Sequence, residues 1–407
     1  MSDRSFVLRP WSFVVAFGVV SLLADMVYEG ARSIIGPYLA TLGASATVVG
    51  LVAGAGELIG YGLRVGSGYV VGRTGRYWTW TIAGYALTVL SVPLIGVTGA
   101  LVPATLLYGT ERLGKATRSP AKDTLLSFAA ARTGRGSAFG VHQALDQTGA
   151  LLGPLLLAAV LAWRDGDYRL AFGVLIVPGV LVLGVLAWIR TRVPDPRVYE
   201  DAGAIPRDPG AQAAALREPL PRRFWQYVAA VAVLSCGVAS FPLLAFHATS
   251  RHLLGDSTIP LLFALAMAVD GLSGPVVGRL YDRRGPLVLL AVPIAAAAAA
   301  VAFTDSVLWL WIGVGVWGIV NGVLDSVIKA TVTELVDPHR RAAAFGWLAL
   351  VRGIGLLIAG GLLGAAYDAG RGWAVALILV ANALALVALA MVLRRMPSGQ
   401  PRDHGQP

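Results

Sequence analysis

Apolar stretches of about 20 residues or more recur along the whole chain. A helix rises 1.5 Å per residue, so each stretch can cross the roughly 30 Å hydrocarbon core of a bilayer. Only 14% of the 407 residues are charged, against about 25% in soluble domains. The pattern predicts an all-α membrane protein. We expect twelve spans, at 11–41, 46–71, 78–98, 101–128, 137–162, 168–190, 224–249, 257–281, 286–304, 307–335, 342–366 and 373–394.

Basic residues are distributed unevenly over the links between these spans. Most lie at the chain ends and in the even-to-odd links, whereas the opposite links carry Arg164, Arg169, Arg251 and Arg371. Because Lys and Arg are retained on the cytoplasmic side, we expect a cell inner (cytoplasmic) membrane protein with both termini in the cytoplasm. The net charge of +10 does not indicate a nucleic-acid partner, since no basic run is interleaved with aromatic residues.

A link rich in Pro, Arg and Asp divides the spans into two sets of six. We therefore predict an N-terminal six-helix bundle over 1–190, a cytoplasmic linker over 191–222, a C-terminal six-helix bundle over 223–395 and a polar tail over 396–407. The single cysteine, Cys236, excludes an intramolecular disulfide, and the histidines show no metal-ligand spacing. We expect no metal and no cofactor, and we expect a monomer.

Two short motifs occur once in each half, at nearly the same separation. The first follows the second span and is repeated after the eighth. Its members are Gly68, Arg73, Gly75 and Arg76 in the first copy, and Gly278, Asp282, Arg283 and Gly285 in the second. The other motif, Arg-x-x-Ala-Phe-Gly, opens the fifth and the eleventh spans. Parallel repeats of six helices, with a binding site between them, are one architecture of secondary transporters.

The first motif resembles the Gly-x-x-x-Asp-Arg-x-Gly signature of the major facilitator superfamily, and the resemblance covers nearly the whole chain. It implies two pseudo-symmetric six-helix bundles and a gating role for the motif residues. The first copy has Gly72 where the family usually has Asp, which leaves the usual charge latch there without its acid. Gly149, Gly153 and Pro154 resemble the Gly-x-x-x-Gly-Pro motif of antiporter members. Small residues at this spacing also allow ordinary close helix packing.

Ionisable side chains inside the predicted spans are the candidate functional residues. A charge at the bilayer centre costs roughly 2.5–3.5 kcal/mol on insertion scales, so each should face a partner or a water-filled cavity. In the first span Asp25, Tyr28, Glu29 and Arg32 share one helix face. The second span carries Glu57, Tyr61 and Arg64, the fourth Glu111, Arg112, Lys115, Arg118 and Lys122, the fifth His142 and Asp146, and the C-terminal half Asp270, Asn321, Asp325, Lys329 and Arg352.

We assign these residues two kinds of role. A carboxylate that gains and loses a cationic partner can bind and release a proton. The expected proton-coupling residues are Asp25, Glu29, Glu111 and Asp146. The expected substrate-binding residues are Tyr28, Arg32, Glu57, Tyr61, Arg112, Lys115, Arg118, Asp270, Asn321 and Asp325. Charges four residues apart, such as Glu111 and Lys115, can also pair within one helix and serve only the structure.

The sequence therefore predicts a secondary transporter with a small-molecule substrate, protons and the lipid bilayer as its partners. The leading function is proton-coupled export of a drug or metabolite. Proton-coupled uptake, or exchange of an organic anion, is the alternative, favoured by the Arg and Lys residues of the fourth span. A channel or a membrane enzyme is a third class. An enzyme needs a nucleophile–base pair or a metal cluster, and the sequence offers neither in a plausible pocket.

Overall fold

The computed structural model describes residues 8–199, 219–337 and 340–394. Most of the predicted linker (191–222) and all of the predicted tail (396–407) lie outside these ranges. No β-strand occurs within them. The chain is therefore all-α over the described residues, as the sequence predicts.

Two sets of helices follow one another along the chain. The first set, the N-bundle, consists of α1 (Pro10–Thr41), α2 (Ala46–Thr74), α3 (Tyr77–Ile95), α4 (Leu101–Thr133), α5 (Arg135–Trp163), α6 (Tyr168–Val174) and α7 (Ile176–Arg192), and is followed by the 3-10 helix η2 (Pro196–Tyr199). The second set, the C-bundle, consists of α9 (Arg222–Cys236), α10 (Phe241–Ser250), α11 (Thr258–Arg284), η3 (Gly285–Leu290), α12 (Ala291–Ala298), η4 (Ala299–Phe303), α13 (Val307–Leu335), α14 (Arg341–Ala369) and α15 (Arg371–Leu393).

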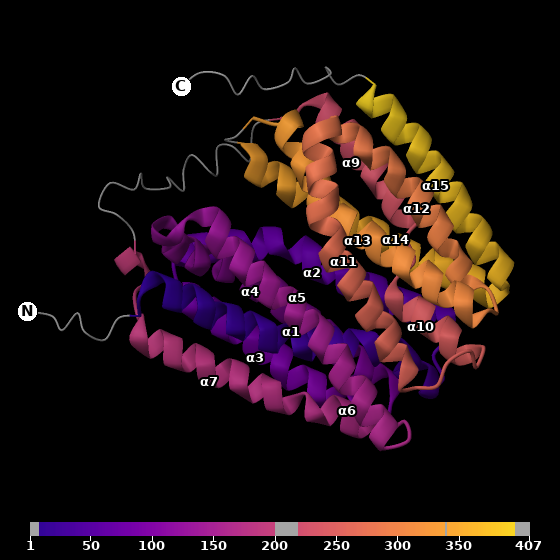
Figure 1. Ribbon diagram of the computed structural model, residues 1–407, viewed down its shortest axis with the longest axis horizontal. Helices are drawn as coiled ribbons and strands as arrows, with labels where there is room; N and C mark the ends of the chain where they lie inside the picture. Colours follow the sequence, from indigo (N-terminus) through magenta and orange to yellow (C-terminus); the bar gives the residue numbers. More distant parts are fainter. Residues whose placement is uncertain (1–7, 200–218, 338–339, 395–407) are drawn as a thin grey trace, which may run out of the picture.

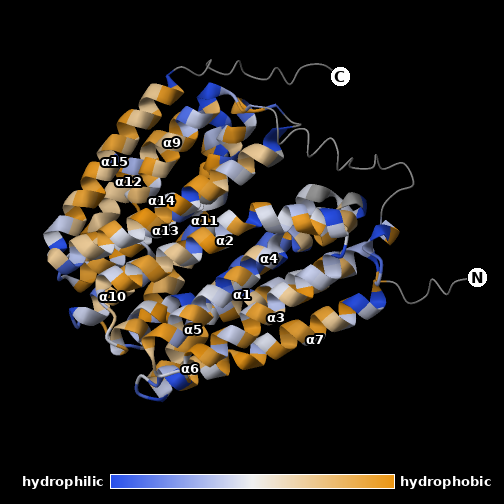
Figure 2. Ribbon diagram, turned by 180° about the vertical axis from the view of Figure 1, so that it is seen from behind, coloured by the Kyte–Doolittle hydropathy of each residue, from blue (hydrophilic) through white to orange (hydrophobic). Residues whose placement is uncertain are grey.

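Helices occupy all twelve predicted spans. Ten described stretches are long and apolar enough to cross a membrane. One of them, Thr258–Phe303, contains two predicted spans, while α4 is missing from the ten because of the many charges in its middle. Side chains such as Leu106 (67% exposed) and Leu272 (74% exposed) point outward, and Figure 2 shows hydrophobic residues along the outer helices α7 and α15. A hydrocarbon surround explains this outward-facing apolar surface.

Three predicted spans are less regular than the sequence suggests. The sixth, expected at 168–190, is interrupted at Leu175, and the ninth, expected at 286–304, is mostly 3-10 helix around the short α12. The seventh, expected at 224–249, breaks between α9 and α10. Non-helical backbone at membrane depth is tolerated where protein groups satisfy its hydrogen bonds.

The two ends of the molecule are called the termini side, where α1 begins and α15 ends, and the distal side opposite to it. Figure 1 shows the ribbons of the two bundles close together at the distal side and diverging toward the termini side. Helices α2 and α14 cross between the bundles. A methyl group on Gly50 would overlap the backbone of Gly360, and one on Gly364 would overlap the Ala46 carbonyl. Only glycine allows these backbones to approach so closely.

In both copies of the repeated motif, a glycine with positive φ ends the helix, α2 in the first and α11 in the second. Gly75 has φ +62° and Gly285 has φ +64°, a left-handed conformation that glycine adopts without strain. The ψ angles differ, at 6° for Gly75 and −159° for Gly285, so the two copies share a positive φ at the closing glycine but not the full backbone conformation.

Candidate functional site

Three acids and two arginines from α1, α2 and α4 form an arginine–glutamate network inside the N-bundle. Glu57 lies 3.2 Å from a guanidinium nitrogen of Arg32 and 3.7 Å from one of Arg112. Arg32 also contacts Glu29 at 3.6 Å, and Arg112 contacts Glu111 at 3.0 Å. Arg112 is only 1% exposed. A guanidinium stays charged under all ordinary conditions, so the network holds its carboxylates near permanent cations.

A second group, the lysine–aspartate cluster, joins α1, α4 and α5. One carboxylate oxygen of Asp146 lies 3.9 Å from Nζ of Lys122 and 3.6 Å from Nδ1 of His142, whose Nε2 is 2.9 Å from Oγ of Ser21. The other oxygen of Asp146 is buried without a hydrogen-bond partner among the described residues. Asp25 is 8% exposed and lies within electrostatic range of Asp146 and Lys122. Unlike arginine, lysine and histidine can release a proton, so this cluster can change its charge.

Basic side chains of α4 also cover the faces of two tyrosines. Nζ of Lys115 lies 4.0 Å from the ring centroid of Tyr28. The Arg118 guanidinium lies 5.4 Å from the same centroid and 4.5 Å from that of Tyr85, and it donates a hydrogen bond to the Thr88 hydroxyl at 2.7 Å. Contacts of this kind stabilise a cation that lacks a carboxylate partner.

A tyrosine on α2 lies between arginines of both bundles. The guanidinium carbons of Arg64 on α2 and Arg352 on α14 each lie 5.2 Å from the ring centroid of Tyr61. Arg352 is 9% exposed, and Nε of Arg64 is buried without a hydrogen-bond partner in the described ranges. Charge inside a predicted span is the sequence signal for both arginines. It predicts that Arg64 neutralises a carboxylate or holds an anionic substrate, and it assigns no role to Arg352.

The expected residues of the C-bundle lie among their own helices. Asn321 donates a hydrogen bond to the Trp317 carbonyl of the same helix at 2.9 Å. Asp270 on α11 lies against Gly322 on α13, where an added methyl group would come within 2.7 Å of its carboxylate. The side chain of Asp325 lies outside the described residues. The structure thus brings together the expected residues of α1, α2, α4 and α5.

The motif residues expected to control gating fall into two groups. On the termini side, Arg73, Arg76, Asp282 and Arg283 are exposed, and added methyl groups on Gly68 and Gly278 would meet no close contact. In α5 the small residues are packing positions. A methyl group on Gly149 or Gly153, the residue before Pro154, would overlap the backbone of α1. The packing interpretation of the Gly-x-x-x-Gly-Pro motif therefore has direct structural support.

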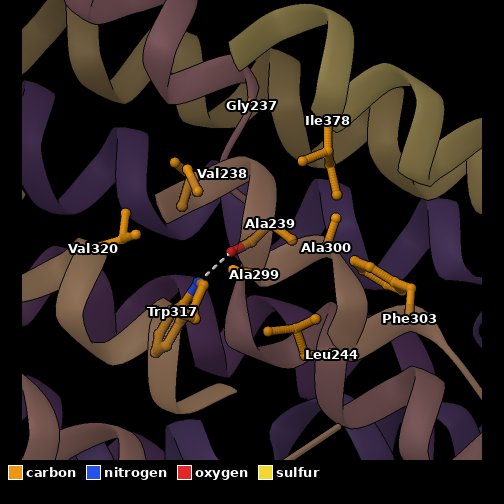
Figure 3. A pocket seen from close by; sticks show the side chains of 11 residues that line it. Gly237, Val238, Ala239, Leu244, Ala299, Ala300, Phe303, Trp317, Val320 and Ile378 are labelled. Atoms are coloured by element: carbon orange, nitrogen blue, oxygen red, sulfur yellow. Dashed lines mark hydrogen bonds between the residues drawn. The ribbon is translucent and has the colours of Figure 1, made fainter. Parts of the chain in front are cut away.

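The break between α9 and α10 is satisfied by side chains of two neighbouring helices. Asn382 on α15 donates to the Gly237 carbonyl at 2.8 Å, and the indole N–H of Trp317 on α13 donates to the Ala239 carbonyl at 2.7 Å. Figure 3 shows the Trp317 bond beside a small cavity whose other lining side chains are apolar. With so little polar lining, the cavity is a poor solute site. Beyond the break, Pro242 on α10 packs against Gly36 on α1.

Polar contacts join the bundles at the distal side. The Asp368 carboxylate on α14 accepts hydrogen bonds from the N-terminal turn of α2, and the Tyr168 hydroxyl donates to Asp256 at 2.9 Å. None of these three residues is among the expected site residues. Their partners are far away in the chain, so no local spacing indicates them. The residues that join the two bundles at the distal side are therefore identified by the three-dimensional structure and not by the sequence.

A separate ion cluster on the distal side lies within the C-bundle. Asp305 accepts hydrogen bonds from Arg251 at 2.9 Å and 3.2 Å and also pairs with Arg371. These hydrogen bonds lower the pKa of Asp305 to about 2. All three side chains are exposed, so solvent screens these ion pairs and their contribution to stability is small.

Comparison with known families explains the helix arrangement. The sequence profile of the Major Facilitator Superfamily matches residues 17–359 and 252–407, which together span nearly the whole chain. This chain belongs to the major facilitator superfamily. The resemblance seen in the repeated motifs is thereby confirmed, and the protein is a multi-pass membrane protein and a secondary transporter by family and fold.

Relatives and solved structures agree with this membership. An uncharacterized protein of Mycobacterium tuberculosis strain H37Rv is 46% identical over 398 residues, covering 97% of this chain and 95% of that protein. A bacterial homologue of the human lysosomal transporter Spinster, in an inward-facing and unoccupied conformation, has a TM-score of 0.75 at 17% identity and covers 95% of this chain and 98% of that chain. A mutant of the nucleoside transporter NupG also has a TM-score of 0.75, at 11% identity, and covers 94% and 99%. At such identities the structures share the fold alone.

Proposed function

We propose that this transporter exports a small solute in exchange for protons. In this mechanism the bundle 1–190 rocks against the bundle 223–395, and the linker 191–222 joins them. We assign both termini to the cytoplasmic side of a bacterial inner membrane, as the distribution of basic residues predicts, and the termini side is then the cytoplasmic one. The closed distal contacts then support an inward-facing state, in which the solute is loaded from the cytoplasm.

The observation that carries the proton coupling is the environment of Asp146. One oxygen of its carboxylate contacts both Lys122 and His142, and the other oxygen is buried without a hydrogen-bond partner among the described residues. Asp25, close by, forms no hydrogen bond or ion pair with any described residue. A buried carboxylate is costly as an anion unless a cation is bound to it. When Lys122 moves away from Asp146, the carboxylate loses its cation and binds a proton more readily. When Lys122 returns, the proton is released.

The two other expected coupling residues support this mechanism less well. Glu111 lies 3.0 Å from Arg112, and Glu29 lies 3.6 Å from Arg32. Because the guanidinium stays charged, these carboxylates have a resident counter-ion in the inward-facing state. We assign them to holding α1, α2 and α4 together, and we assign proton exchange to Asp25 and Asp146.

Dissipation of a pH gradient tests the proposal without a labelled substrate. Everted membrane vesicles that contain the transporter are acidified inside by respiration, and solutes are added while a fluorescent weak base reports the gradient. An exchanged solute should release protons from these vesicles but not from vesicles without the transporter. A solute shown to be transported whose flux is independent of an imposed pH gradient would contradict proton coupling.

Uptake of an organic anion with protons is a second candidate, which the basic side chains on α4 favour. The two directions are distinguished in intact cells. Energised cells that express an exporter should contain less of the solute than control cells, and cells that express a symporter should contain more.

A further inference from the structure

We infer that the transported solute is an organic anion whose carboxylate, sulfonate or phosphate group binds Arg64 and Lys115 between α2, α4 and α14. This inference rests on the proposed transport function and names its substrate class.

Arg64 and Lys115 are cations without a bound acid. Neither has a carboxylate oxygen within 4.0 Å anywhere in the described ranges, because each contacts a tyrosine ring instead. One of the Arg64 nitrogens, Nε, is buried without a hydrogen-bond partner in the same ranges. Charges inside a membrane protein are costly unless paired. An anionic ligand would supply the missing partner to both side chains.

The acids of the arginine–glutamate network are already engaged, and Asp25, which acts on Lys115 at longer range, is the residue assigned to proton exchange. Glu57 contacts Arg32 at 3.2 Å and Arg112 at 3.7 Å. Glu29 and Glu57 act on Lys115 only at longer range. The network holds three carboxylates and two arginines, and Arg64 and Lys115 beside it raise the cations to four, so the whole group remains net positive by one charge.

The tyrosines of the site do not offer a free face to a cation. Lys115 and Arg118 cover Tyr28, and Arg64 and Arg352 cover Tyr61. A cationic drug is commonly recognised by open aromatic faces together with a free carboxylate. The same surfaces are here occupied by the protein's own cations, which favours a solute of the opposite charge.

The position of Tyr61 also links anion binding to the movement of the bundles. Arg64 belongs to the N-bundle and Arg352 to the C-bundle, and each lies 5.2 Å from the Tyr61 centroid. An anion bound beside this ring is attracted to both bundles at once. Its binding would stabilise the state in which the two arginines are closest.

Binding of small aromatic probes to the purified full-length protein tests the inference. The anions are benzoate, benzenesulfonate and phenyl phosphate, and the matched controls are neutral benzamide and cationic benzylamine. Binding is followed by thermal shift and calorimetry. At least one anion should bind ~10-fold more tightly than both controls, because charge-assisted hydrogen bonds are the strong ones. Arg64→Gln and Lys115→Gln should each weaken that binding ~10-fold, whereas Lys115→Arg should largely preserve it.

Arg223→Gln is the matched control, since Arg223 is an exposed arginine at the start of α9. Melting of each variant without ligand shows whether it is folded. Tighter binding of benzylamine or benzamide, absence of binding by all three anions, or unchanged affinity in both Gln variants would overturn the inference. Anion binding together with a flux that ignores the pH gradient would contradict the proton coupling and leave the anion site standing.

Discussion

The Asp368 carboxylate on α14 accepts hydrogen bonds from the backbone N–H and the hydroxyl of Thr47 on α2, at 2.9 Å and 2.5 Å. A third bond comes from the N–H of Ala46 at 3.0 Å. These N–H groups belong to the first turn of α2, where the helix has no acceptors of its own and where a negative charge is favourable. One carboxylate therefore caps a helix of the opposite bundle, and it must leave that helix before the distal side can open.

Asp368→Asn should shift the transporter toward the distal-open state. Hydrogen bonds to a charged group contribute about 1.5–3 kcal/mol, so the open state should gain roughly tenfold or more in population. The readout is labelling of Ala53→Cys, a position 3% exposed on α2, by an impermeant maleimide in a Cys236→Ser background. Asp305→Asn is the control, because Asp305 also lies on the distal side but bonds only within the C-bundle. Equal labelling in the two variants would contradict the prediction.

Gly360→Val should prevent distal closure and abolish transport. The added side chain would overlap the backbone of Gly50, and helix backbones cannot yield as a side chain can. The measurement is disulfide formation between Thr47→Cys and Asp368→Cys in a Cys236→Ser background. The Gly360→Val variant should lose this cross-link. Gly66→Val is the control, because Gly66 has open space around it, and this variant should still form the bond.

Asp146→Asn should uncouple transport from the proton gradient. Asparagine keeps the shape of the side chain but cannot bind and release a proton at physiological pH. Accumulation driven by a pH gradient should fall by at least ~10²-fold, in line with the loss of an essential acid–base group. Exchange of labelled for unlabelled solute should continue. Asp123→Asn is the matched control, since Asp123 follows Lys122 in α4 but its side chain is exposed. Gradient-driven accumulation at the wild-type rate would rule out Asp146 as the coupling residue.

The Asp305 cluster should contribute to stability independently of pH in the physiological range. The pKa of Asp305 falls from its ordinary value of 3.8 to about 2 because Arg251 and Arg371 bond to the charged form. A lowered carboxyl pKa stabilises the folded state above the ordinary value, and the effect disappears as the pH falls through the folded one. The difference in melting temperature between wild type and Asp305→Asn should stay constant from pH 5 to 8 and shrink below about pH 4. A difference that changes between pH 6 and 8 would contradict this assignment.

The helices were predictable because bilayer thickness sets their length. The span expected at 46–71 became α2 at Ala46–Thr74, and the span expected at 342–366 became α14 at Arg341–Ala369. The break between α9 and α10 does not show in the mean hydropathy of 224–249, although Gly237, Ser240 and Pro242, which favour helix ends, stand at it. Asn382 and Trp317, from two other helices, hold the carbonyls that the break releases. The local residues thus indicate where the helix breaks, but not which distant donors satisfy its carbonyls.

The convergence of charges on one interior seam was also predictable, because hydrocarbon excludes them. The sequence spacing of these charged residues does not determine which side chains they contact. Glu111 and Lys115 are four residues apart and could have paired within α4, but Glu111 instead contacts Arg112, and Lys115 lies over Tyr28. Side-chain direction and the neighbouring helix decided each contact. The hydrogen bond between Thr47 and Asp368 was equally unpredictable, since it joins residues in opposite halves of the chain.

The crossing of α2 and α14 has a thermodynamic consequence of its own. Where Gly50 meets Gly360 and Gly364 meets Ala46, backbone touches backbone, with hardly a rotatable bond between them. Bringing these surfaces together freezes almost no rotamers, so the joint can part and meet again with little entropic penalty. At these glycine contacts, opening and closing of the distal side requires little side-chain repacking in each transport cycle.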